Sequence, residues 1–153
     1  MQDFSSILNH IAPYITFSEE EKELFTSVLK IKKIKRKQFL EQPGYVSKNR
    51  SYVVNGALRA FFIGTDGQEH TIALAIEDRW IGDPGSFMLQ EPATLFIEAI
   101  EDSTLIQLSY DSEKMLLKKV PLCKLTNGKL STDCGDTATT YYIACKPFSG
   151  GTL

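Results

Sequence analysis

Short apolar segments, each closed by residues that favour turns, limit this chain to a small set of folds. Asn55-Gly56 ends one segment, and Asp66-Gly67 is a strong hairpin signal between two others. Short strands at such regular spacing predict a mainly β sandwich or barrel. The expected strands cover residues 51–54, 58–63, 69–76, 94–100 and 104–108.

Two helices are expected ahead of these strands. Ser18 to Glu21 has the S-x-x-E form of a capping box, and apolar residues follow it at helical spacing. This pattern predicts a helix over about 19–29, preceded by a short helix around 3–11.

A further helix is expected after the last strand. It should begin near Asp111, with Asp111 or Ser112 as its N-cap, and Pro121 should stop or kink it.

Between the helices and the strands lies a basic run, in which six of the eight residues from Lys30 to Lys37 are Lys or Arg. One interpretation is a nucleic-acid or lipid patch. The other is a solvent-facing edge strand whose lysines prevent strand pairing, with Ile31 and Ile34 turned inward. The chain carries a net charge of −2, which favours the edge strand.

Composition points to a globular cytoplasmic chain. Apolar residues make up 42% and charged residues 24% of the sequence. The N-terminus lacks the basic start and apolar run of a secretory signal, and no apolar stretch approaches the roughly 20 residues that cross a bilayer. We therefore expect no membrane partner, and no global attraction to nucleic acid.

Residues 51–87 resemble the centre of a cyclic-nucleotide-binding domain. That family has an apolar strand into Gly, a second strand, a hairpin, a third strand, an acidic turn and an aromatic residue before Gly-Glu. The matching segments are Tyr52 to Gly56, Leu58 to Phe62, Asp66-Gly67, His70 to Ala75, Glu77-Asp78 and Trp80 to Asp83.

The similarity continues through Pro121, so that it covers about residues 4–122. The ordered set resembles the catabolite-activator and fumarate–nitrate-regulator (Crp/Fnr) family of bacterial transcription regulators. This resemblance implies a jelly roll, or double-stranded β-helix, with N-terminal helices and a short C-terminal helix. It also implies a ligand-sensing domain whose DNA-binding helix-turn-helix, which follows in the family, is missing here.

The resemblance also implies a ligand site. In the family a short helix begins just after Gly-Glu, so that backbone N–H groups and the helix dipole face a cyclic phosphate. The Glu accepts a hydrogen bond from the ribose, and an Arg followed by Ser, Thr or Ala binds the phosphate. The positions of this cassette are Gly82, Asp83, Gly85, Ser86, Ala93 and Thr94.

This chain departs from the family at the Arg position, which is Ala93. A buried phosphate that lacks this bidentate partner loses about 2–5 kcal/mol. Arg59 and Arg79 are the candidate substitutes. We expect a small-molecule effector and weak or absent binding of cyclic AMP. The alternative is a stand-alone roll without nucleotide that serves structure, interaction or homodimerisation.

Catalysis and metal binding are not expected. A cupin-type metal enzyme needs two or three histidines with a carboxylate, and the chain has only His10 and His70. The three cysteines are eleven residues apart, which is not the spacing of a zinc or redox motif. From the sequence we expect no cofactor and no enzymatic activity.

The composition changes after residue 122, which divides the chain into a sensor domain (1–122) and an atypical tail (123–153). The tail holds all three cysteines and as many threonines, six, as the preceding 122 residues. It is expected to be poorly ordered. It is either a native tail or the product of a frame slip, since Phe148 to Thr152 read one base later permits Ser-Ala-Glu-Glu-Arg. With no helix-turn-helix, the chain is not expected to bind DNA.

Overall fold

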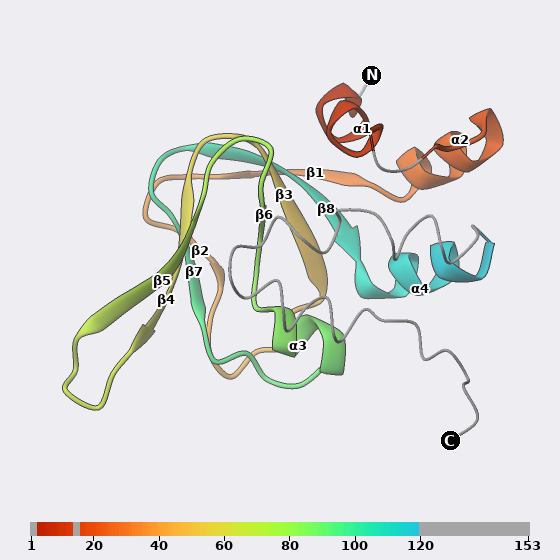
Figure 1. Cartoon of the computed structure of the whole chain (residues 1–153). Helices are drawn as coiled ribbons and strands as arrows, with labels where there is room; N and C mark the ends of the chain where they lie inside the picture. The colour runs from red at the N-terminus through yellow and green to blue at the C-terminus, as the bar shows by residue number, and fades with distance from the viewer. Residues whose placement is uncertain (1–2, 14–15, 120–153) are drawn as a thin grey trace.

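In a computed structural model, residues 3–13 and 16–119 form two antiparallel sheets with four short helices (Figure 1). One sheet has the strand order β1-β8-β3-β6 and the other the order β2-β7-β4-β5. The strands are β1 (Lys30–Ile34), β2 (Phe39–Glu41), β3 (Asn49–Asn55), β4 (Leu58–Ile63), β5 (Glu69–Ala75), β6 (Trp80–Ile81), β7 (Phe96–Ala99) and β8 (Ser103–Ser109). The helices are α1 (Ser5–Ile11), α2 (Glu19–Ser27), α3 (Pro84–Leu89) and α4 (Tyr110–Lys119). This arrangement confirms the mainly β jelly roll.

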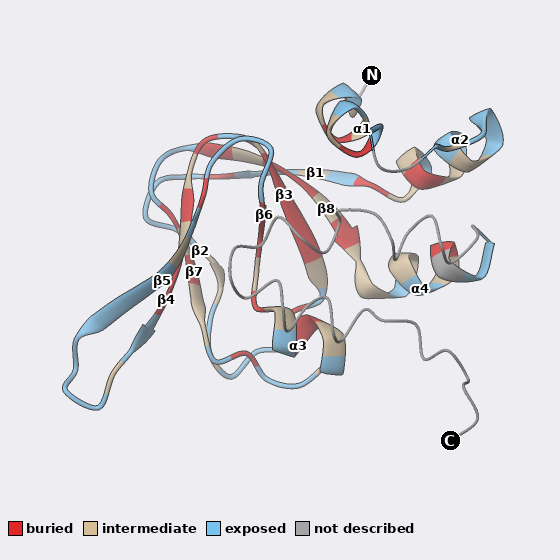
Figure 2. Cartoon of the chain, in the orientation of Figure 1, coloured by how far each residue is buried: buried red, intermediate tan, exposed pale blue. Residues whose placement is uncertain are grey.

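Two apolar clusters hold the roll together. One fills the space between the sheets, where Val53 and Leu105 of the first sheet meet Leu58 and Ile97 of the second. The other lies on the outer face of the first sheet, beneath the helices. Figure 2 shows the contrast with the β4–β5 hairpin, which extends from the roll and is largely exposed.

The N-terminal helices form as the sequence predicts, although α2 ends two residues early. Its capping box is complete, because Ser18 Oγ accepts from the Glu21 amide and a Glu21 carboxylate oxygen accepts from the Ser18 amide. At its C-terminus the Ser27 hydroxyl donates to the Leu24 carbonyl at 2.6 Å, and Val28 is the C-cap residue. The helix stops there because β1 begins at Lys30.

The basic run contains the predicted edge strand, β1, but its two isoleucines do not share a face. Ile34 lies in the core between the sheets, whereas Ile31 packs against the cluster beneath the helices. Residues three apart in a strand point to opposite faces, so the two side chains turn inward on different sides. Lys32 shares the inner face with Ile34 and lines a cavity there.

The expected strands are all present, with boundaries shifted by up to two residues, and only 58–63 matches residue for residue. Two strands were not predicted: β2 and β6 have three and two residues, too few for a periodic pattern. The cap expected at Asp111 or Ser112 is instead Ser109, whose hydroxyl accepts from the Ser112 amide at 3.1 Å.

The tail, 123–153, and Pro121 lie outside the residues that the structure describes. Among the described helices, none is both long and apolar enough to span a membrane.

Candidate functional site

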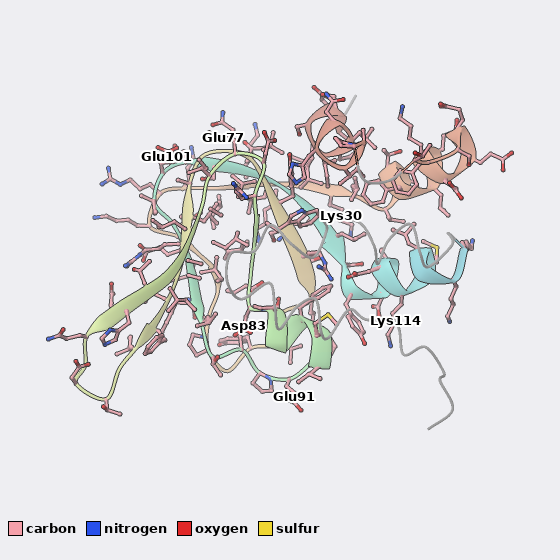
Figure 3. All side chains as sticks on the ribbon, in the orientation of Figure 1. Lys30, Glu77, Asp83, Glu91, Glu101 and Lys114 are labelled. Atoms are coloured by element: carbon pink, nitrogen blue, oxygen red, sulfur yellow. The ribbon has the colours of Figure 1, made fainter. Side chains whose placement is uncertain are left out.

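The candidate site forms around Asp83, which begins α3 (labelled in Figure 3). The residue has an extended backbone, and its carboxylate oxygen Oδ1 accepts from the Ser86 amide at 3.1 Å. Pro84 occupies the first helical position, where its missing N–H needs no partner. Short as it is, α3 is therefore capped at its start by a side chain.

The second carboxylate oxygen of Asp83 connects α3 to the segment before β7. Oδ2 accepts from the amides of Thr94 and Leu95, at 2.9 and 3.2 Å. The Thr94 hydroxyl is also 3.4 Å from Oδ2. Asp83 is only 6% exposed, so the carboxylate is a buried internal crosslink. It joins Asp83 to Ser86 and Thr94, two other expected cassette positions, and Gly82 directly precedes it in the chain.

Ser86 connects α3 to the loop before β3. Its buried hydroxyl accepts from the Ser47 amide at 2.8 Å and donates to the Glu91 carbonyl. The Gln90 side chain donates to the Ser47 carbonyl at 2.9 Å. These bonds fix α3 against the loop.

The other two cassette positions differ in their surroundings. Ala93 is 4% exposed, and its backbone pairs with the chain at Gly44 and Tyr45. A larger side chain at position 93 would have to displace packed neighbours. Gly85 is exposed and does not have a positive φ, so a methyl group there would meet only the Asp83 carboxylate, at 3.6 Å.

The two candidate arginines lie on β4 and in the turn before β6. The Arg59 guanidinium lies over the Phe61 ring and contacts Glu69 and Glu98, at 2.8 and 3.4 Å. The pKa of Arg59 is raised, chiefly by its hydrogen bond to Glu69. Arg79 is exposed in the turn before β6, where its carbonyl accepts from the Val53 amide.

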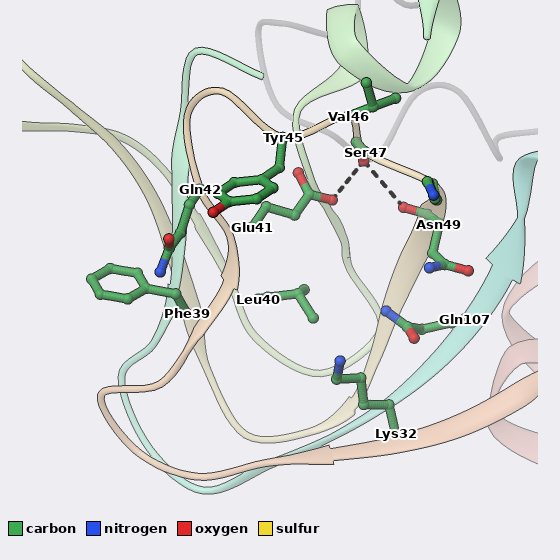
Figure 4. Close-up of a pocket in the computed structure, with 11 residues that line it drawn as sticks. Lys32, Phe39, Leu40, Glu41, Gln42, Tyr45, Val46, Ser47, Asn49 and Gln107 are labelled. Atoms are coloured by element: carbon green, nitrogen blue, oxygen red, sulfur yellow. Dashed lines mark hydrogen bonds between the residues drawn. The ribbon is translucent and has the colours of Figure 1, made fainter. Parts of the chain in front are cut away.

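Glu41, at the end of β2, is a residue of the site that the sequence did not single out. One of its carboxylate oxygens accepts from the Ser47 hydroxyl at 2.7 Å (Figure 4). The other accepts from the Asp83 amide at 2.9 Å. Desolvation by burial raises the pKa of Glu41 to about 7, against the lowering effect of these two hydrogen bonds.

Glu41 also borders a cavity of about 340 Å³ that opens between β1, β2 and β8 (Figure 4). This volume is within the range of small-molecule sites. Besides Glu41, the polar lining comes from Lys32, Gln42, Ser47, Lys48, Asn49 and Gln107, and the less polar lining from Phe39, Leu40, Tyr45 and Val46. The cassette positions themselves do not line it.

Arg50 is the second residue that the sequence did not reveal. Its guanidinium is buried over the Phe87 ring of α3 and binds Glu113 of α4 at 2.8 Å. It borders a space of only about 20 Å³ together with Gly82 and Asp83. No periodic signal marks Glu41 or Arg50, because each position becomes special only when distant segments meet.

Metal ligation has no geometric basis in the described part of the chain, where no group of three or more His, Cys, Asp or Glu residues converges. His70 is half-exposed on β5, 3.6 Å from Asp66 across the hairpin.

No protein-family profile and no curated protein sequence matches the chain. Solved structures do. The Thermus thermophilus catabolite activator protein aligns with a TM-score of 0.61 and 23% identity, over 69% of this chain and 49% of that protein. The chain thus spans about half the length of that relative.

Two further regulators share the fold. The sensor domain of the transcriptional regulator DNR from Pseudomonas aeruginosa aligns with a TM-score of 0.62 at 14% identity, over 73% of this chain and 74% of that domain. The c-di-GMP-responsive regulator CLP from Xanthomonas campestris aligns with a TM-score of 0.64 at 13% identity, over 84% of this chain and 61% of that protein. At these identities the similarity concerns the fold, which is that of cyclic-nucleotide-binding-type sensor domains.

Proposed function

We propose that this chain is the effector-sensing domain of a bacterial transcription regulator. Residues 1–122 would form the sensor, and 123–153 a tail that is native or frame-shifted. The observation that carries the proposal is the Asp83 crosslink, which builds a cassette-like turn and helix α3 beside a cavity of ligand size. Sensor domains of regulators with this fold support it.

Cyclic AMP is a poor candidate for the effector. The position that would hold an anion-binding arginine is a buried alanine, Ala93. The amides of Ser86 and Thr94 already donate to the Asp83 carboxylate. A cyclic phosphate would have to compete with this internal anion without the help of a guanidinium.

The test is saturation binding of the purified full chain, by calorimetry, to cyclic AMP and cyclic di-GMP, followed by a thermal-shift screen of small-molecule effectors. We expect cyclic AMP to bind weakly or not at all, and at least one other compound to raise the melting temperature by mass action. Sub-micromolar binding of cyclic AMP would contradict the cassette argument.

The second candidate is a structural or interaction module with an empty roll. It is favoured by the internal hydrogen bonding of Asp83 and Ser86, which satisfies the cassette without a ligand. A screen in which no effector stabilises the chain would favour this alternative.

A further inference from the structure

The carboxyl group of Glu41 is pressed against the start of α3. Its oxygens accept from the Asp83 amide and the Ser47 hydroxyl, at 2.9 and 2.7 Å. A methyl group built on Gly82 would lie 3.3 Å from the nearer oxygen, so the carboxyl group packs closely against the glycine. Glu41 therefore occupies the inner side of the cassette turn.

Together Glu41 and Asp83 accept from four backbone amides of this turn and of the segment before β7. Glu41 accepts from the Asp83 amide, and Asp83 accepts from the amides of Ser86, Thr94 and Leu95. An incoming anion that used any of these four amides would meet a donor already bonded to a carboxylate of the chain itself. It must displace one of them or lie beside it.

The two carboxylates differ in what they hold together. Asp83 joins α3 to the strand beyond it and is part of the fold. Glu41 projects from β2 and borders the 340 Å³ cavity, where a ligand has room. Burial raises the pKa of Glu41 to about 7, so that its charge changes within the physiological range.

We propose that Glu41 determines the charge of the ligand that the roll accepts: ionised, it excludes anions, and an anionic effector binds only together with a proton on Glu41. The proposal rests on the proposed sensing function and specifies the ligand class, which at neutral pH and above is uncharged or cationic. At an effective dielectric constant of about 20, a unit anion about 5 Å from an ionised carboxylate binds about 300-fold more weakly.

Other charged groups face Glu41 from several elements. Asp83 faces it from the α3 cap, and its charge adds to the raised pKa of Glu41. Lys32 of β1 and Lys48 of the loop line the same cavity, as does the Tyr45 hydroxyphenyl group. A substitution at position 41 leaves all of them in place, so that a comparison with wild type isolates Glu41.

The experiment is calorimetric titration of 3′,5′-cyclic AMP, as an anionic probe, into the wild-type chain and the Glu41→Gln and Glu98→Gln variants. Gln keeps the size of Glu and removes its charge. Glu98→Gln is the matched control: it removes the same charge on the other face of the second sheet, where Glu98 contacts Arg59.

At about pH 8.5 we expect Glu41→Gln to bind the probe at least about tenfold more tightly than wild type, and Glu98→Gln to behave like wild type. Between about pH 8.5 and about pH 6 the wild-type affinity should rise at least about tenfold, while that of Glu41→Gln changes less than about twofold.

Equal affinities of wild type and Glu41→Gln at high pH would overturn the inference. If both bound tightly, the sensing function would stand and only the role of Glu41 would fail. If neither bound at either pH, removal of the charge would not admit an anion, and the effector screen would decide the sensing function separately. Should the variant not fold, the pH dependence of wild-type binding tests the inference by itself, and an affinity that does not change with pH would overturn it.

Discussion

At the scale of single residues, Glu41 links the stability of the chain to pH. A carboxyl group whose pKa is raised on folding binds more protons in the native state than in the unfolded state. The pKa of Glu41 rises from an ordinary 4.5 to about 7. The stability that protonated Glu41 contributes is therefore complete below pH 4.5, and it is lost as pH rises through about 7.

Replacement of Glu41 by Gln should remove this pH dependence. We expect the unfolding free energy of wild type to fall by up to about 3 kcal/mol between pH 4.5 and 7, and that of Glu41→Gln to stay flatter. Above pH 7 the variant should be the more stable protein. Urea denaturation at a series of pH values measures this. If the unfolding free energies of the two proteins changed with pH in the same way, folding would not raise the pKa of Glu41.

Glycines differ sharply in what they would tolerate. Gly56 has a φ of +109°, and a methyl group there would lie 2.1 Å from the Ser103 hydroxyl oxygen and 2.7 Å from its Cα atom. Gly56→Ala should cost at least about 2 kcal/mol because both the backbone and the contact are strained. Thermal unfolding measures the loss.

Gly85→Ala is the matched control for this loss. Position 85 lies in the first turn of α3 without a positive φ, so alanine should be neutral or stabilise by up to about 1 kcal/mol. Of the two cassette glycines, Gly82 and Gly85, Gly82 has the closer neighbour, the Glu41 carboxyl group. Equal melting losses for Gly56→Ala and Gly85→Ala would contradict this distinction.

Among the elements, α4 is joined to the roll by a largely buried ion pair, in addition to the apolar packing of Leu116. Arg50 of β3 is 6% exposed in its side chain and binds Glu113 of α4 at 2.8 Å, while its guanidinium covers Phe87 of α3. Three elements that are distant in the sequence thus meet at one cation. Such a pair stabilises the folded chain little more than apolar packing at the same place would. Removing one partner is costly, however, because the charge of the other stays buried.

Glu113→Ala should therefore destabilise the chain by about 3 kcal/mol, which is the typical cost of breaking a buried pair. The measurement is chemical denaturation, followed by far-ultraviolet circular dichroism, which reports the loss of helix. Lys35→Ala, which removes an exposed pair with Asp102, provides the control and should leave the midpoint unchanged. A Glu113→Ala midpoint equal to that of Lys35→Ala would rule out a structural role for the pair.

For the molecule as a whole, the described residues form the jelly roll, and DNA binding by the chain is a separate question. Regulators of the helix-turn-helix class read the major groove with a recognition helix, usually as a dimer. The tail holds only three lysines, Lys124, Lys129 and Lys146, and its sequence shows no capped pair of amphipathic helices. Few phosphates could be neutralised by so few cations.

We expect the purified chain to show no sequence-specific DNA binding and only feeble non-specific binding, as measured by fluorescence anisotropy at physiological salt. Resequencing of the gene beyond codon 122 is the companion test. An open shifted frame that continues through Ser-Ala-Glu-Glu-Arg into a helix-turn-helix would establish a slip. An early stop in that frame would leave a natural tail, and specific DNA binding by the chain would refute the expectation.

Elements that depend on neighbouring residues could be predicted from the sequence alone. The Ser18–Glu21 box, the Asp66-Gly67 hairpin and most strand segments follow from local patterns, and all three are present. The cassette positions between 82 and 94 were implied by the family resemblance and not by a local pattern. Short strands such as β6 could not be predicted, since two residues carry no period.

Which side chains face the ligand space depends instead on the tertiary structure. Glu41 and Asp83 are 42 residues apart, and Arg50 and Glu113 are 63 apart. Neither separation has a sequence signature, because burial and hydrogen bonding depend on how the two sheets close. Arg59 is a second example. The sequence made it a candidate anion partner for the cassette, but side chains alternate along β4, and its own points outward to Glu69 and Glu98.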